Sequence, residues 1–166
     1  MKKLFLALMM MLPMAAMAQA KFGHVNSAEM MQAMPEFTQA RTDIEALTKQ
    51  YEADLKLMQD ELQKKGEAFE KEQATLPENI KQRRQQDLQD MYQKIQQSYQ
   101  DNQQALQQAQ QEKMQAITTK IVDAIKKVGE AGGYVYIMDL TAGIPYISTT
   151  LSTDVTTQVK AQLGLK

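Results

Sequence analysis

Few residues in this 166-residue chain have the chemistry that catalysis or metal binding requires. The sequence contains one histidine, His24, and no cysteine, so it offers no thiolate ligand, no cysteine nucleophile and no disulfide. It also lacks a Gly-rich phosphate-binding loop and a G-x-S-x-G nucleophile motif. We expect His24 to pack in a strand beside Val25, and Asp139 to cap a turn rather than act as an acid or base. The sequence therefore predicts neither an enzyme nor a cofactor.

The charge balance argues against a nucleic-acid partner. The chain has 19 Lys and Arg residues against 20 Asp and Glu residues, whereas nucleic-acid binders normally carry a clear basic excess. Glycine and proline are scarce, and aromatic residues make up only 6% of the chain, which is low for a compact domain of this size. This composition argues against an ordinary globular enzyme.

The first twenty residues have the features of a secretory signal peptide. Lys2 and Lys3 precede a nine-residue apolar run, residues 4–12, and small residues follow with possible cleavage points after Ala18 or Ala20. The run is too short to span a bilayer, which takes about 20 residues, so an N-terminal membrane anchor is the weaker reading. Loss of Lys2 and Lys3 leaves 17 basic residues against 20 acidic ones. We therefore expect an exported, mildly acidic protein without stable membrane insertion.

The segment before Pro77 has the pattern of a coiled-coil helix. It contains no proline after Pro35 and one glycine, Gly66. Its apolar residues recur every three or four positions, with two further members at seven-residue intervals, which predicts one apolar seam on a long helix. The predicted seam consists of Phe37, Ala40, Ile44, Leu47, Tyr51, Leu55, Met58, Leu62, Phe69 and Leu76.

The segment after Pro77 has neither proline nor glycine before Gly129, and its apolar residues follow a different period. They recur every eleven residues, close to three helical turns, so the predicted seam runs almost straight along the helix. The recurring residues are Ile95, Leu106, Ile117 and Val128, and also Ile80 and Met91. Glutamine fills 15 of the 34 positions from 82 to 115, which predicts a weakly charged helix surface.

Residues 36–130 are expected to form an antiparallel helical hairpin with its tip near residues 75–79. Thr75 and Glu78 have the spacing of a capping box around Pro77, so we expect Thr75 to start the second helix. One continuous kinked helix is the alternative, but proline disfavours helix in the preceding residue, and nothing would then cover either seam.

The two ends of the chain, residues 21–35 and 131–166, are expected to form a small β-rich body. Residues 22–26 fit one strand; residues 134–138 and 144–149 fit two more, joined as a β-hairpin by residues 141–143. Ser27 is the predicted cap of a short helix, and Asp154 or Ser152 the predicted cap of a last helix. The fold class is therefore α+β, mostly α, with a long helical hairpin projecting from the body.

The body is too small to be stable by itself. Domains of about 50 residues are marginal without disulfides, metals or partners, and this sequence provides neither of the first two. We therefore expect several copies to share one body. The residues expected to build it are Phe22, Val25, Tyr134, Tyr136, Ile137, Ile144, Tyr146 and Ile147.

The order of these segments resembles the Skp/OmpH family of periplasmic chaperones across essentially the whole processed chain. The resemblance is carried by K-x-G-x-V-N at residues 21–26, by GGYVYIMD at residues 132–139, and by D-x-T-x-x-V at residues 154–159. It implies a homotrimer with a β-barrel body and three helical tentacles that enclose a cavity. It also implies an ATP-independent holdase that keeps unfolded outer-membrane proteins soluble in the periplasm.

The acidic balance departs from this family, whose best-known members are strongly basic. Long-range electrostatic steering should therefore be weak here and largely screened by salt. Lys81, Arg83 and Arg84 form the only basic cluster near the tip, so a lipopolysaccharide site is not transferred to this chain.

Client binding must then rest on apolar contacts. The candidate residues are Leu57, Tyr92 and Met114, which lie beside or between seam positions, although they could equally widen the seam. The alternative function is a non-chaperone periplasmic coiled-coil spacer or adaptor. The two functions differ in whether the chain prevents an unfolded outer-membrane protein from aggregating.

Overall fold

The computed structural model describes residues 20–165, so the predicted signal peptide lies outside the described residues except for Ala20. The elements in chain order are β1 (Lys21–Val25), α2 (Ser27–Ala33), α3 (Pro35–Glu72), α4 (Glu78–Gly132), β2 (Tyr134–Asp139), the 3₁₀ helix η1 (Leu140–Ala142), β3 (Ser152–Asp154) and α5 (Thr156–Gln162). Two long helices and one small sheet confirm the expected mostly helical α+β class. The chain divides into two compact units: residues 35–117 form one, and residues 20–34 with 118–165 form the other.

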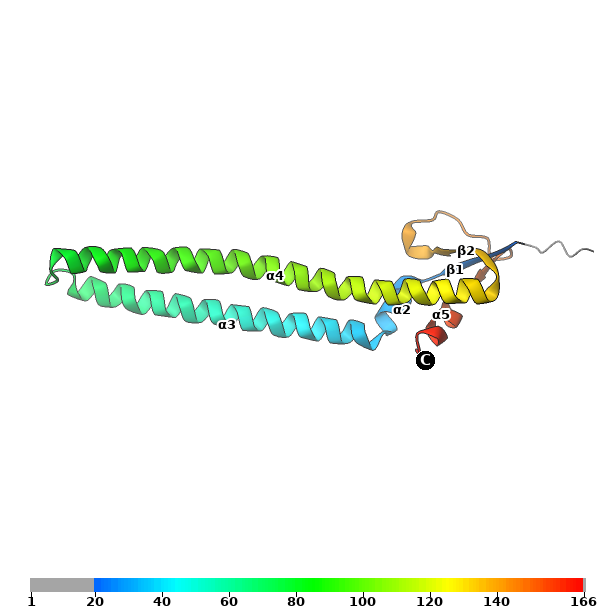
Figure 1. The fold of residues 1–166 in the computed structure, drawn as a ribbon, viewed down its shortest axis with the longest axis horizontal. Coiled ribbons are helices and arrows are strands. Elements are labelled where there is room, and N and C mark those ends of the chain that lie inside the picture. The colour runs from blue at the N-terminus through cyan, green and yellow to red at the C-terminus, as the bar shows by residue number, and fades with distance from the viewer. Residues whose placement is uncertain (1–19, 166) are drawn as a thin grey trace, which may run out of the picture. The chain divides into compact units, whose positions relative to one another are not determined.

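The first unit is the helical hairpin (Figure 1), in which α3 lies antiparallel to α4. Two ion pairs of 2.6 Å join the helices, one between Asp43 and Lys113 and one between Glu72 and Arg84. Asp43 and Glu72 are 29 residues apart on α3, and their partners Lys113 and Arg84 are 29 residues apart on α4. Both ion pairs therefore fit one antiparallel register of the two helices. Every predicted seam residue of α3 is buried or half-buried, which confirms the seam.

The eleven-residue period of α4 is also present in the structure. Ile95 and Ile117 are buried, at 8% and 3% exposure, while Leu106 and Val128 are half-buried. Two polar residues, Ser98 and Asn102, are also half-buried and complete the seam between Ile95 and Leu106. The α4 seam is therefore less apolar than the α3 seam.

The turn between the helices differs from the expected capping box. The Thr75 hydroxyl donates a 2.9 Å hydrogen bond to the carbonyl of Glu72, so it closes α3 instead of opening α4. The carbonyl of Pro77 accepts from the backbone N–H groups of Ile80 and Lys81 and begins α4. Proline fits this place because it has no N–H that the first turn would leave unpaired.

The second unit contains a three-stranded parallel sheet in the order β2-β1-β3. The expected β-hairpin is therefore wrong: residues 144–149 form no strand, and β3 is the short segment Ser152–Asp154. Pro145 has no N–H to donate to a ladder, and residues 143–151 instead connect the two outer strands. β1 is the central strand, so the two ends of the chain meet in one sheet.

Helices cover one face of this sheet (Figure 1), where α2, α5 and the C-terminal part of α4 gather, while residues 143–151 run along the other face. A Cβ atom added to Gly23 would lie 3.0 Å from Ile137 and 3.2 Å from Tyr134. A Cβ atom added to Gly129 on α4 would meet the same Ile137 at 3.4 Å. Gly23 therefore allows β1 and β2 to approach closely, whereas a Cβ atom at Gly129 would make an ordinary van der Waals contact with Ile137.

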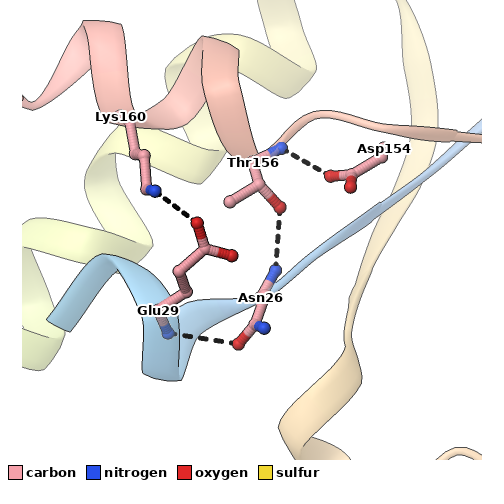
Figure 2. A network of polar contacts seen from close by, with 5 residues as sticks. All are labelled: Asn26, Glu29, Asp154, Thr156 and Lys160. Carbon is pink, nitrogen blue, oxygen red and sulfur yellow. Dashed lines mark hydrogen bonds and ion pairs between the residues drawn. The ribbon is translucent and has the colours of Figure 1, made fainter. Parts of the chain in front are cut away.

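The helix-covered face contains the core of this unit. Val25, Met30, Val155 and Val159 are fully buried. Figure 2 shows the polar contacts that hold α5 against β1 and α2. Lys160 forms an ion pair with Glu29, and the Thr156 hydroxyl accepts from the backbone N–H of Asn26.

The caps of the short helices are partly those expected. Asn26, not Ser27, caps α2 by accepting from the N–H of Glu29. Asp154 accepts from the N–H of Thr156, the first residue of α5, but Val155 holds the N-cap position and makes no side-chain capping hydrogen bond. Each polar side chain therefore supplies an acceptor for a backbone N–H that would otherwise be unpaired at the start of the helix.

Asp139 joins the end of β2 to the start of α2. Its carboxylate accepts hydrogen bonds from the backbone N–H and the hydroxyl of both Ser27 and Thr141. Partial burial raises the pKa of Asp139, but these hydrogen bonds outweigh it and hold the pKa below its usual value. The hydrogen bonds therefore stabilise the folded unit most when Asp139 is ionised.

Asp139→Asn should lower the free energy of unfolding at pH 7 by about 2 kcal/mol, because hydrogen bonds to a charged group are lost. The Asp139 contribution is complete above the unfolded carboxyl pKa and is lost as the pH falls through the lowered folded pKa. The difference between wild type and variant should therefore begin to shrink as the pH falls below about 4. Denaturant unfolding followed by circular dichroism at pH 7 and pH 3 checks this, and an equal difference at both values would contradict it.

Candidate binding and assembly surfaces

The residues considered for catalysis have structural partners. The Nδ1 atom of His24 lies 2.8 Å from the Ser152 hydroxyl across the β1–β3 pair, and Asp139 caps η1. Within residues 20–165, no group of His, Asp and Glu side chains is placed to hold a metal ion. In the same part of the chain, no helix has both the length and the apolar character needed to cross a membrane.

The sheet face opposite the helices is rich in exposed apolar side chains. Phe22 and Tyr136 stack with their ring centroids 4.8 Å apart. Around them lies a groove of about 300 Å³, whose further apolar lining residues are Met138, Ile144, Tyr146, Ile147 and Leu151. Tyr146 and Leu151 are 79% and 69% exposed. We call these seven residues the apolar sheet face.

The predicted body residues fall into two groups. Phe22, Tyr136, Ile144, Tyr146 and Ile147 belong to the apolar sheet face. Val25 is fully buried in its own chain, while Tyr134 and Ile137 pack beside Gly23. Sequence reasoning missed Met138 and Leu151. The alternation of side chains along β2, in which Met138 follows Tyr136 by two positions, was the available signal for Met138.

Met114 lies in a groove between the two helices of the hairpin. The groove has a volume of about 540 Å³, and its apolar lining includes Phe37, Ala40 and Ile44 of α3. Charged residues at its edge include Lys113, whose hydrogen bond lowers the pKa of Asp43. The groove therefore combines an apolar floor with an ion pair that holds the two helices in register.

The structure does not bring Leu57, Tyr92 and Met114 together. Leu57 is 68% exposed on α3 and lies outside the seam, while Tyr92 is 57% exposed on α4. Tyr92 and Met114 are 22 residues apart, about 33 Å along a helix. Tyr99, which the sequence reasoning missed, is 54% exposed and shares a face with Tyr92 because it follows seven residues later.

The basic cluster near the tip is partly neutralised. Arg84 pairs with Glu72, and a groove of about 490 Å³ beside it contains Asp87 and Asp90 as well as Lys65. The mixed charge of this groove does not favour an anionic ligand.

Comparison with known proteins gives a family and a fold. The sequence model described as "Outer membrane protein (OmpH-like)" matches residues 21–163. A crystal structure from Caulobacter crescentus CB15, described as that of an OmpH-like outer membrane chaperone, superposes with a TM-score of 0.73 at 16% identity. The similarity covers 87% of this chain and 83% of the Caulobacter chain. Among curated proteins, no relative matches.

The hairpin register predicts a specific chemical cross-link. A carbodiimide joins a carboxylate to an amine in contact, so Lys113 should couple to Asp43, 2.6 Å away. Mass spectrometry of digested protein should find this link in wild type and lose it in Asp43→Asn. The link between Glu45 and Lys49, which are 2.7 Å apart on α3, serves as the control in both proteins. Coupling of Lys113 to a carboxylate elsewhere on α3 would contradict the register.

Proposed function

Because the chain belongs to the OmpH-like family of outer membrane proteins, we propose that it is an ATP-independent holdase chaperone. In this proposal it binds unfolded outer-membrane proteins in the periplasm and prevents their aggregation. The name of the Caulobacter relative, an outer membrane chaperone, supports the proposal. The signal-peptide pattern of residues 1–20 supports export to that compartment.

The observation that carries the proposal is the exposure of large apolar side chains on the hairpin. Leu57, Tyr92 and Tyr99 are each more than half exposed, and Met114 lies in an open groove. An unfolded barrel strand has apolar side chains on alternate positions, and burying them stabilises a complex by about 25 cal/mol per Å². Separate, shallow contacts of this kind hold a client without fixing its conformation.

The second part of the proposal is assembly through the apolar sheet face. Exposed apolar patches of this kind mark interaction sites, and one unit of this size has a marginal core. We propose that the chain assembles as a homotrimer, as the family resemblance implies. In this assembly each copy covers the apolar sheet face of another copy. The hairpins of the three copies would then enclose the client.

Replacement of Leu57, Tyr92 and Met114 together by Ser tests the client surface. The variant should suppress aggregation of a urea-denatured outer-membrane barrel protein less than wild type, by about tenfold in the concentration required, since apolar contact area is lost. Light scattering after dilution of the client, with no nucleotide added, gives the measurement.

The matched control replaces exposed neighbours of the same helices, Ala53, Gln93 and Ala116, by Ser. This control should protect like wild type, and both proteins should keep the wild-type mass in solution. Full protection by the test variant would reject these three positions. Failure of wild type to protect any client would reject the chaperone and favour the coiled-coil spacer or adaptor.

Tyr146→Asp with Leu151→Asp tests the assembly surface. Two buried, unpaired carboxylates would oppose association, so the oligomer should dissociate to a smaller mass in sedimentation experiments. The control Thr149→Asp with Thr150→Asp adds the same charge at exposed polar positions of the same loop and should leave the mass unchanged. An unchanged mass in the first variant would exclude this face as the contact between copies.

A further inference from the structure

Two sets of glutamines that recur along α4 differ chemically. Gln86, Gln97 and Gln108 recur every eleven residues, and each donates to an acidic residue four positions later, namely Asp90, Asp101 and Glu112. Their amides are therefore used in stabilising the helix surface. The residue before each of them, at positions 85, 96 and 107, is also glutamine. This neighbouring set faces a different side of the helix, because successive residues are about 100° apart.

That side of α4 forms a continuous face, here called the amide face. It consists of Tyr92, Gln96, Tyr99, Gln100, Gln103 and Gln107, which are all exposed. Among residues 20–165, one hydrogen bond engages its side chains, from the Gln103 amide to the Tyr99 hydroxyl 3.1 Å away. Within the described residues, the side-chain amides of Gln96, Gln100 and Gln107 have no partner in the chain. Their donors and acceptors are available to a ligand.

The amide face carries no charge. Between residues 88 and 111, the charged residues of α4 are Asp90, Lys94 and Asp101. None of them lies three or four positions from a residue of the amide face, so none is its neighbour along the helix surface. A face about 20 Å long therefore presents only amides, phenol groups and aromatic rings.

These groups match one kind of partner. Each glutamine amide has two N–H donors and a carbonyl acceptor, and each unit of a polypeptide main chain has one N–H donor and one carbonyl acceptor. Tyrosine adds an apolar ring with a polar tip. We infer that the amide face binds the main chain of extended, unfolded polypeptide segments, independently of their charge; this inference rests on the proposed holdase function. Each bond to a glutamine replaces one to water and is weak singly, so a client can exchange partners along the face.

Other occupants fit less well. A helix from a second copy would need a continuous apolar seam, and the amide face has only two aromatic residues among four glutamines. A nucleic acid would need basic residues, which the face lacks. Since the amide face has neither a continuous apolar seam nor basic residues, the neutral polypeptide main chain is the ligand that complements it.

Charge inserted into the face separates these cases. Gln96→Glu with Gln107→Glu and Gln96→Lys with Gln107→Lys should each raise the Kd for a urea-denatured outer-membrane barrel protein by about tenfold, because a charge without a partner must lose water on binding. The loss should be alike for a net acidic and a net basic version of that client, as measured by fluorescence anisotropy. The matched controls Gln50→Glu with Gln59→Glu, and the same pair to Lys, add equal charge on exposed positions of α3. They should change the Kd by less than about twofold, as expected for exposed positions outside the binding face.

Unchanged binding in both charge variants would overturn the inference while leaving the holdase function intact. Opposite effects of Glu and Lys on one client would also overturn it, because binding would then be electrostatic. A changed oligomer mass would identify the face as a contact between copies instead. If wild type binds neither client, the proposed function itself fails.

Discussion

The pairing of β1 with β2 and β3 is the constraint on which the rest of the structure depends. β1 lies in the centre of the sheet, and both neighbours come from the other end of the chain. Parallel strands cannot be joined by a tight turn, so residues 26–133 must leave β1 and return before β2. A hairpin of two long helices achieves this return. Gly23 eases the pairing, because a Cβ atom there would lie 3.0 Å from the Ile137 side chain and 3.2 Å from that of Tyr134, which would have to shift slightly.

The eleven-residue repeat gives α4 several surfaces at once. Because eleven residues almost complete three helical turns, each position of the repeat stays on one side of the helix over its whole length. The seam positions contact α3, the Gln–acid pairs stabilise the helix on a second side, and the amide face occupies a third. A helix with a seven-residue repeat would instead supercoil to keep its seam facing the partner. The repeat therefore keeps the seam residues and the residues of the proposed binding face on separate sides of α4.

The hairpin could be predicted from the sequence, whereas the sheet could be predicted only in part. The spacing of apolar residues and the position of Pro77 determine the two helices, because these signals are local. The segment 144–149 looked like a strand through its β-branched and aromatic residues, yet Pro145 and the parallel topology exclude it from the sheet. The strand that does form, Ser152–Asp154, is short and polar. Its strand structure depends on pairing with β1, which its own residues do not signal. The amide face required knowledge of which glutamines already have partners.

The proposed assembly requires that other copies of the chain cover the apolar sheet face. Sedimentation of the chain from Lys21 onward, followed by circular dichroism over a wide dilution series, tests it most directly. We predict one oligomeric mass at high concentration, and loss of folded signal as dilution separates the copies. A monomer that remains fully folded at high dilution would contradict the claim.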